Sequence, residues 1–236
     1  KMRIDDVLVS YTTMKKSEVK KIIKQNRVLV DGIPINLINH QVDSNINEVK
    51  LDGKPVQFPV HRYLMLNKVI RTLSANQDAS LPVVFDALSP DINREGLYII
   101  GRLDFLSEGL ILITDNGKLG RKLLEPEAHV EKVYEVVTKE PLSETAVAEF
   151  ASGLVIDGTV KLAPAKLVVM SEHTASITIS EGKNRQIRKM FLSIGVLVTK
   201  LVRTEIGPIK LDKQLASGDY RSLTKPEIKA LSRYFN

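Results

Sequence analysis

A carboxylate and a guanidinium lie in a short glycine-bounded loop that precedes a buried strand. Arg102 and Asp104 follow Gly101, and the apolar residues 110–114 are predicted to form the strand. An Asp-Asn-Gly sequence, whose residues tolerate left-handed backbone, makes the turn after it. A carboxylate held in this way is placed for chemistry, because it can act as a nucleophile or remove a proton. The alternative is a solvated turn in which both side chains meet only water.

Two later stretches carry further polar side chains that could join this carboxylate. Tyr134 lies in an alternating strand over residues 129–137, where a tyrosine is more often part of the core than of a site. A second strand, a turn at Gly182 and a helix with an apolar stripe follow. Cations cover the rest of that turn and helix: Lys183, Arg185, Arg188 and Lys189. By themselves, these cations favour a solvated helix face over a binding surface.

The composition indicates a protein with an ordinary core and a positive charge balance. The chain has 236 residues, of which 43% are hydrophobic and 26% charged, and its net charge is +6. The length allows a small domain beside a medium one, and the charge favours a polyanionic partner. The absence of cysteine excludes disulfides, thiolate nucleophiles and cysteine-ligated zinc, and fits a cytoplasmic protein. We expect no membrane span and no signal peptide, with Met2 as the natural first residue.

The first 58 residues are predicted to form a module of their own, joined by a proline-containing linker to the rest. Val19, Ile22 and Ile23 recur at helical spacing, and a hairpin with an Asp-Gly turn is predicted over residues 28–35. The opposite face of the helix and the residue that leads into the hairpin are basic: Lys15, Lys16, Lys20, Lys21, Lys24 and Arg27. This surface is either a solvated lysine face or a means of presenting cations to phosphates.

These motifs, in this order, resemble the signature of the pseudouridine synthases, most closely the branch of ribosomal small-subunit pseudouridine synthase A. Three runs carry the resemblance: Gly101-Arg102-Leu103-Asp104 with Gly109-Leu110 and Thr114-Asp115-Asn116-Gly117; Glu131-Lys132-Val133-Tyr134; and Gln186-Ile187-Arg188. The resemblance implies that Asp104 is the catalytic aspartate, that Tyr134 is the active-site tyrosine and that Arg188 pairs with Asp104. The chain departs from the pattern after Asn67-Lys68, where the family has Pro-x-Gly and this chain has Val69-Ile70-Arg71.

The N-terminal module resembles the alpha-L RNA-binding domain. Arg3-Ile4-Asp5, Lys16-Ser17-Glu18 and the run from Asn26 to Gly32 carry that resemblance. It implies that Lys20, Lys21, Lys24 and Arg27 contact RNA phosphates, which give affinity and register more than sequence choice. The two resemblances together imply an α+β protein. We expect an RNA-binding domain over residues 1–58 and, over residues 59–236, a catalytic domain with a long mixed, mainly antiparallel sheet.

The implied activity is isomerisation of a uridine in ribosomal RNA, which involves no redox change and needs no cofactor. In this reaction Arg188 would keep Asp104 ionised and Tyr134 would stack on a target base that is flipped out of the RNA. Arg102 would fill the vacated space or grip a phosphate, and Lys183, Arg185 and Lys189 are further candidates for RNA contact. The four histidines show no metal-ligand spacing, and no phosphate-binding glycine loop or dinucleotide fingerprint occurs, so we expect neither metal nor nucleotide cofactor.

Three functional hypotheses remain open at this point. The first is a synthase acting on small-subunit (16S) rRNA, either free or in an assembling particle. The second is a synthase of the same family that acts on large-subunit rRNA. The third is a non-catalytic RNA-binding assembly factor, supported only by the Val69-Ile70-Arg71 departure. We expect a cytoplasmic monomer.

Overall fold

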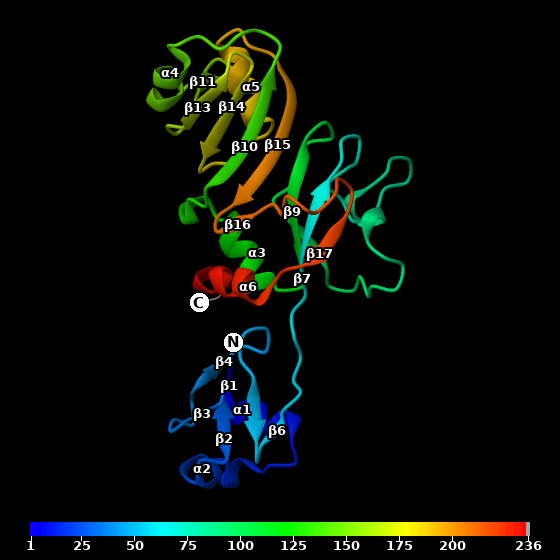
Figure 1. Cartoon of the computed structure of the whole chain (residues 1–236), viewed down its shortest axis with the longest axis vertical. Helices are drawn as coiled ribbons and strands as arrows, with labels where there is room; N and C mark the ends of the chain where they lie inside the picture. Colours follow the sequence, from blue (N-terminus) through cyan, green and yellow to red (C-terminus); the bar gives the residue numbers. More distant parts are fainter. Residues whose placement is uncertain (235–236) are drawn as a thin grey trace. The chain divides into compact units, whose positions relative to one another are not determined.

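The computed structural model describes residues 1–234, which divide into two compact units (Figure 1). One unit contains residues 1–61 with the segment that begins at Thr224, and the other contains Arg62–Leu223. The expected boundary between residues 58 and 59 stays a prediction about independently folding domains. Within residues 1–234 no helix is long and apolar enough to cross a membrane.

The described part of the first unit is a small α/β module with three α-helices, one 3-10 helix and a four-stranded antiparallel sheet. Its helices are α1 (Ile4–Tyr11), α2 (Lys16–Lys24), α6 (Lys225–Leu231) and the 3-10 helix η3 (Ser232–Tyr234). Its sheet has the order β3 (Ile33–Pro34), β2 (Val28–Val30), β5 (Val49–Leu51) and β6 (Lys54–Pro55), and β1 (Met2–Arg3) pairs separately with β4 (Gln41–Val42). The inward faces of α1, α2 and β2 form one buried cluster, which includes Val7, Val19 and Ile22.

The hairpin predicted in this unit is confirmed. Strands β2 and β3 are joined by Asp31 and Gly32, whose φ angles of 51° and 80° are both positive. This is the backbone that a two-residue hairpin loop needs, because its twist matches that of the strands. The lysine helix α2 directly precedes this hairpin, so the module presents its cations from a rigid element.

The second unit is built on one mixed, nine-stranded sheet, which confirms the predicted α+β class. Seven strands form a continuous path in the order β13 (Lys166–Ser171), β14 (Thr174–Ile179), β10 (Lys132–Thr138), β15 (Val198–Ile206), β9 (Glu108–Thr114), β7 (Tyr63–Lys68) and β17 (Tyr220–Ser222). Strand β8 (Tyr98–Ile100) also pairs with β9, and β16 (Ile209–Lys210) pairs with β15. All of these strand pairs are antiparallel except β15 with β9, so the sheet is mainly antiparallel, as expected.

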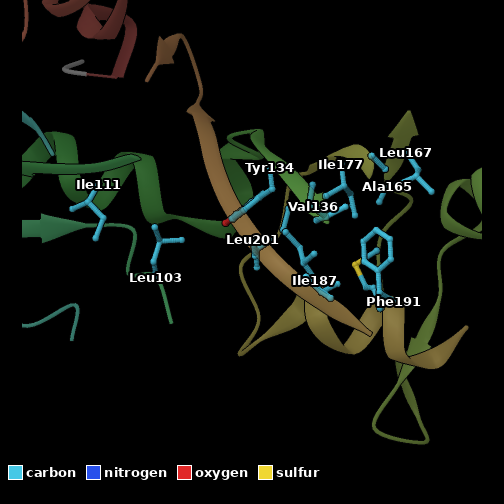
Figure 2. Packing of buried hydrophobic residues seen from close by; sticks show 14 of the residues in the cluster. Leu103, Ile111, Tyr134, Val136, Ala165, Leu167, Ile177, Ile187, Phe191 and Leu201 are labelled. Atoms are coloured by element: carbon cyan, nitrogen blue, oxygen red, sulfur yellow. The ribbon is translucent and has the colours of Figure 1, made fainter. Parts of the chain in front are cut away.

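The remaining elements of this unit are short. They are η1 (Val84–Ala87), α3 (Gly117–Leu124), η2 (Pro126–Ala128), α4 (Ala146–Ser152), the hairpin of β11 (Val155–Ile156) with β12 (Val160–Lys161), and α5 (Gln186–Ser193). The apolar stripe predicted for α5 packs on the sheet, where Ile187 and Phe191 lie beside Ile177 and Leu167 (Figure 2). The Phe191 ring contacts that of Phe150 from α4, with 4.9 Å between centroids. Burying these side chains fixes α5 and therefore the cations that follow Gly182.

The single parallel pairing is short and divides the sheet into two halves. Only Val202↔Glu108 and Arg203↔Gly109 are in register between β15 and β9. Strands β13, β14, β10 and β15 lie on one side of this junction, and β9, β7 and β17 lie on the other (Figure 1). The loop that contains Asp104 leads directly into β9 at the junction.

Candidate active site

The loop that carries Asp104 connects β8 to β9 and is held by hydrogen bonds at several points. It starts at Gly101, whose φ is 73°. The Ser74 hydroxyl accepts from the Leu103 N–H at 2.9 Å and donates to the Leu103 carbonyl at 2.6 Å. The Asp104 carbonyl accepts from the Ser107 N–H at 3.0 Å, and the Phe105 carbonyl accepts from the Arg71 N–H at 2.7 Å. The backbone on both sides of Asp104 is therefore fixed.

The Asp104 carboxylate itself is left available. The side chain is half-buried, and its oxygens make no hydrogen bond or ion pair with any other residue in the described 1–234. A carboxylate on a fixed loop without a structural partner is suited to reaction with a bound molecule. Arg102 is exposed, as the solvated-turn alternative predicts, whereas Asp104 is half-buried next to the buried Leu103.

Lys68, at the end of β7, is a site residue that sequence reasoning missed. It is 1% exposed, and its Nζ donates to the carbonyls of Val69 at 2.9 Å and Ser107 at 2.8 Å. Burial lowers the pKa of Lys68 to about 8, and the negative charges of Asp104 and Glu108 oppose that shift. Lys68 is thus a buried cation close to the Asp104 carboxylate. Its signal in the sequence was a lysine that ends an otherwise apolar strand.

The lowered pKa of Lys68 predicts a pH dependence of stability. The folded protein releases this proton near pH 8, whereas the unfolded chain keeps it up to the ordinary value of 10.5. The unfolded state therefore binds more protons between these two pH values. As the pH rises from about 8 to 10.5, Lys68 should raise the free energy of unfolding by as much as about 3 kcal/mol. Urea unfolding of the wild type and Lys68→Met at pH 7.5 and pH 10 measures this. A wild-type-minus-variant difference that does not change with pH would contradict it.

Arg188 reaches the Asp104 loop from helix α5. Its Nη2 donates to the Leu106 carbonyl at 2.8 Å and its Nη1 to the Val198 carbonyl at 3.0 Å. Burial lowers the pKa of Arg188, the nearby Asp104 charge opposes this and Arg185 adds to it. Arg188 therefore lies within electrostatic reach of Asp104, yet the two form no ion pair within the described part of the chain. The Arg188–Asp104 pairing that the resemblance implies is therefore absent among the described residues, because the guanidinium bonds to backbone carbonyls instead.

Tyr134 and Arg203 face each other across the antiparallel strands β10 and β15. Tyr134 is 7% exposed, and the Arg203 guanidinium carbon lies 6.0 Å from the centroid of its ring. Figure 2 shows the tyrosine hydroxyl directed toward Leu103, which immediately precedes Asp104. This hydroxyl makes no hydrogen bond within residues 1–234 and is not fully enclosed. Tyr134 thus combines a largely buried ring with a hydroxyl that has no hydrogen-bond partner among the described residues.

Arg203 is the second site residue that the sequence did not reveal. It is 1% exposed, and its Nε donates to the Leu110 carbonyl at 2.8 Å while its Nη2 donates to the Gly101 carbonyl. It therefore ties together the two ends of the Asp104 loop. Gly109 makes this possible, because a Cβ at that position would lie 2.3 Å from the Arg203 carbonyl oxygen. The loop is locked at the junction of the two half-sheets.

The other cations predicted to contact RNA differ in whether an acidic side chain already pairs with them. Lys20, Lys21 and Lys24 are exposed on α2 without ion pairs among the described residues, as are Arg102 and Arg185 beyond the module. Arg27, by contrast, makes two 2.7 Å hydrogen bonds to Asp52. Lys183 pairs with Glu181, and Lys189 pairs with Asp157 at 2.6 Å. RNA contact by these three would require exchange of an existing partner.

The site therefore joins an available carboxylate with two nearby cations and a tyrosine, brought from β7, the β8–β9 loop, β10 and α5. A carboxylate beside two positive charges is suited to attack on an electrophilic carbon or to removal of a proton. Within residues 1–234 no group of three or more His, Asp or Glu side chains is arranged to hold a metal ion.

Comparison with known proteins gives consistent matches along the chain. The RNA pseudouridylate synthase family matches residues 24–193, and the S4 domain family matches residues 2–45. YtzG of Bacillus subtilis (strain 168), an uncharacterized RNA pseudouridine synthase, is 36% identical over 235 residues, 98% of each chain. Ribosomal small subunit pseudouridine synthase A of Pasteurella multocida is 32% identical over 234 residues, 98% of this chain and 100% of that relative. A crystal structure of a pseudouridylate synthase matches 98% of this chain and 100% of its own, with 30% identity and a TM-score of 0.69.

Proposed function

Because the chain belongs to the RNA pseudouridylate synthase family, we propose that it converts one uridine of small-subunit ribosomal RNA to pseudouridine. The observation that carries this proposal is the half-buried, unpartnered carboxylate of Asp104 beside Lys68 and Arg188. Relatives named ribosomal small subunit pseudouridine synthase A align over nearly the full chain and support the choice of substrate. We further propose that the protein acts as a cytoplasmic monomer, on free rRNA or on an assembling particle.

The reaction exchanges one bond of the base for another without adding or removing atoms. The bond from N1 to the ribose carbon breaks, the base rotates, and a bond from C5 to that carbon forms. C5 then loses a proton and N1 gains one, so reactant and product are isomers. The Asp104 carboxylate serves as the nucleophile at the sugar, as the stabiliser of an oxocarbenium-like state, or as the base that removes a proton.

The surrounding residues of the site have distinct parts in this reaction. Lys68 and Arg188 hold positive charge near Asp104 and orient its loop through the carbonyls of Ser107 and Leu106. Tyr134 contacts the flipped base, and its accessible hydroxyl is placed to assist the loss of the proton from C5. Arg102 and Arg185, both exposed and unpaired within the described chain, contact the RNA near the target.

The N-terminal module holds the RNA through phosphate contacts from α2. Replacing Lys20, Lys21 and Lys24 together by Gln should raise the Kd for unmodified 16S rRNA. It should also reduce the slope of log Kd against log salt by about 2 to 3, because close to one fewer ion is released for each phosphate contact that is lost. Filter binding at several salt concentrations measures both quantities. Arg27→Gln serves as the comparison, since Arg27 already pairs with Asp52. A salt slope equal to that of the wild type would exclude α2 from the interface.

The proposed function is tested by chemical mapping of pseudouridine. Unmodified small-subunit and large-subunit rRNA, and partly assembled small subunits, are each incubated with the purified protein. We expect one new pseudouridine, located in the small-subunit RNA. A new site only in large-subunit RNA would correct the substrate and retain the enzyme. Tight binding with no new site in any of the three substrates would instead favour a non-catalytic assembly factor.

A further inference from the structure

Two arginines have a backbone conformation that arginine seldom adopts. Within the described chain, seven non-glycine residues have positive φ, and five of them are Asn, Asp or His, the types that tolerate it best. The other two are Arg71, with φ of 60°, and Arg185, with φ of 50°. For a residue with a long side chain this conformation is unfavourable relative to glycine, and such outliers cluster at functional sites.

Arg71 lies in the turn after β7, and this turn is bonded to the Asp104 loop. Its N–H donates to the Phe105 carbonyl at 2.7 Å, next to Asp104 in the chain. The same turn is closed by the Val69 carbonyl, which accepts from Lys68 Nζ at 2.9 Å and from Thr72 Oγ1 at 2.8 Å. These bonds impose the left-handed conformation on whatever residue occupies position 71. Glycine would adopt it at no steric cost, so what an arginine adds at this position is its side chain.

The Arg71 side chain has no role within the protein. It is exposed, and its guanidinium makes no hydrogen bond or ion pair with any residue among 1–234. Lys183, in the turn before α5, and Lys189, in α5, are by contrast paired with Glu181 and Asp157. An unpaired guanidinium beside a catalytic loop offers a planar pair of donors that matches a phosphate.

We propose that Arg71 binds a backbone phosphate of the RNA next to the flipped uridine, and so positions that nucleotide over Asp104. This inference rests on the proposed function. Arg185 provides a parallel, since it is also exposed, left-handed and unpaired in the described chain. It lies three residues before Arg188, whose guanidinium donates to the Leu106 carbonyl of the same loop. The two strained arginines thus belong to the two segments that bond to Phe105 and Leu106.

The test uses variants that remove the charge and keep the turn. Glycine and asparagine both tolerate a positive φ, so Arg71→Gly and Arg71→Asn should unfold at the wild-type temperature or above it. Both should nevertheless raise the Kd for unmodified 16S rRNA about tenfold. They should also reduce the slope of log Kd against log salt by about 1, because one phosphate contact is lost. Arg121→Gln, which removes one exposed charge from α3, is the matched control and should leave both quantities at their wild-type values.

The outcomes separate this inference from the proposed function. A wild-type Kd and salt slope in both Arg71 variants would overturn the phosphate contact. A fall in thermal stability that parallels the loss of binding would also overturn it, because the side chain would then support the fold. Product formation is followed in the same samples: a wild type that makes no pseudouridine sinks the proposed function, while the salt slope still decides whether Arg71 contacts RNA.

Discussion

Asp104→Asn should lower the single-turnover rate of pseudouridine formation by at least about 10³-fold while the protein stays folded. Asparagine has the size of aspartate and no charge, so it can neither attack the ribose carbon nor remove a proton. Because the Asp104 carboxylate has no partner among the described residues, its replacement breaks no structural bond. The variant isolates the chemistry from the fold.

The measurement combines rate, affinity and stability. Single-turnover reactions with excess protein give the rate on the rRNA identified by mapping, filter binding gives the Kd, and thermal unfolding reports the fold. The Kd should change little, since phosphate contacts supply most of the affinity. Asp91→Asn, an exposed aspartate elsewhere in the same unit, is the matched control and should react at the wild-type rate. A wild-type rate for Asp104→Asn would mean that another residue carries the reaction.

Gly109→Ala should lower the free energy of unfolding by about 3 kcal/mol or more and abolish activity with it. Gly109 has a φ of 99°, and an added Cβ would lie 2.3 Å from the Arg203 carbonyl oxygen and 2.9 Å from its nitrogen. These are backbone atoms, which cannot rotate away as a side chain can. The methyl group would therefore push β9 from β15 and release the loop that Arg203 holds.

A second glycine of the same unit provides the control for this substitution. Gly117 begins α3 with no neighbour within 4 Å of its Cβ position and without a positive φ. Gly117→Ala should therefore change stability by less than about 1 kcal/mol, since alanine favours a helix. Urea unfolding of both variants gives the comparison. If Gly109→Ala were as stable as Gly117→Ala, the close approach of β9 to β15 would be disproved.

Local patterns in the sequence were sufficient for several elements and for the loop that carries Asp104, but they did not reveal helices α1 and α6. The Asp31-Gly32 hairpin, strand β9 and the apolar stripe of α5 each follow from residues a few positions apart. The type of sheet came only from the resemblance, because strand order and direction depend on contacts between distant segments. The Val69-Ile70-Arg71 departure left the shape of this loop open, and Arg71 takes the left-handed backbone that a glycine would take.

What the sequence could not predict is the pairing of charged side chains over long separations. Arg203 bonds to carbonyls 93 and 102 positions away, and nothing near it in the chain distinguishes it from a surface arginine. Arg27 was predicted to contact RNA, and the structure pairs it with Asp52, 25 positions later. Lys68 was read as the polar end of a strand, because burial of a lysine depends on what packs over it.

The bond from Arg203 to Gly101 also determines when activity can arise during synthesis. Asp104 leaves the ribosome about a hundred residues before Arg203, whereas Arg71 and Ser74, which also bond to its loop, are made earlier. Contacts between such distant positions close slowly, since the entropy of a long loop must be overcome first. In a nascent chain the Asp104 loop therefore lacks its bonds to Arg203 until β15 has paired, and we expect activity to appear only late in folding.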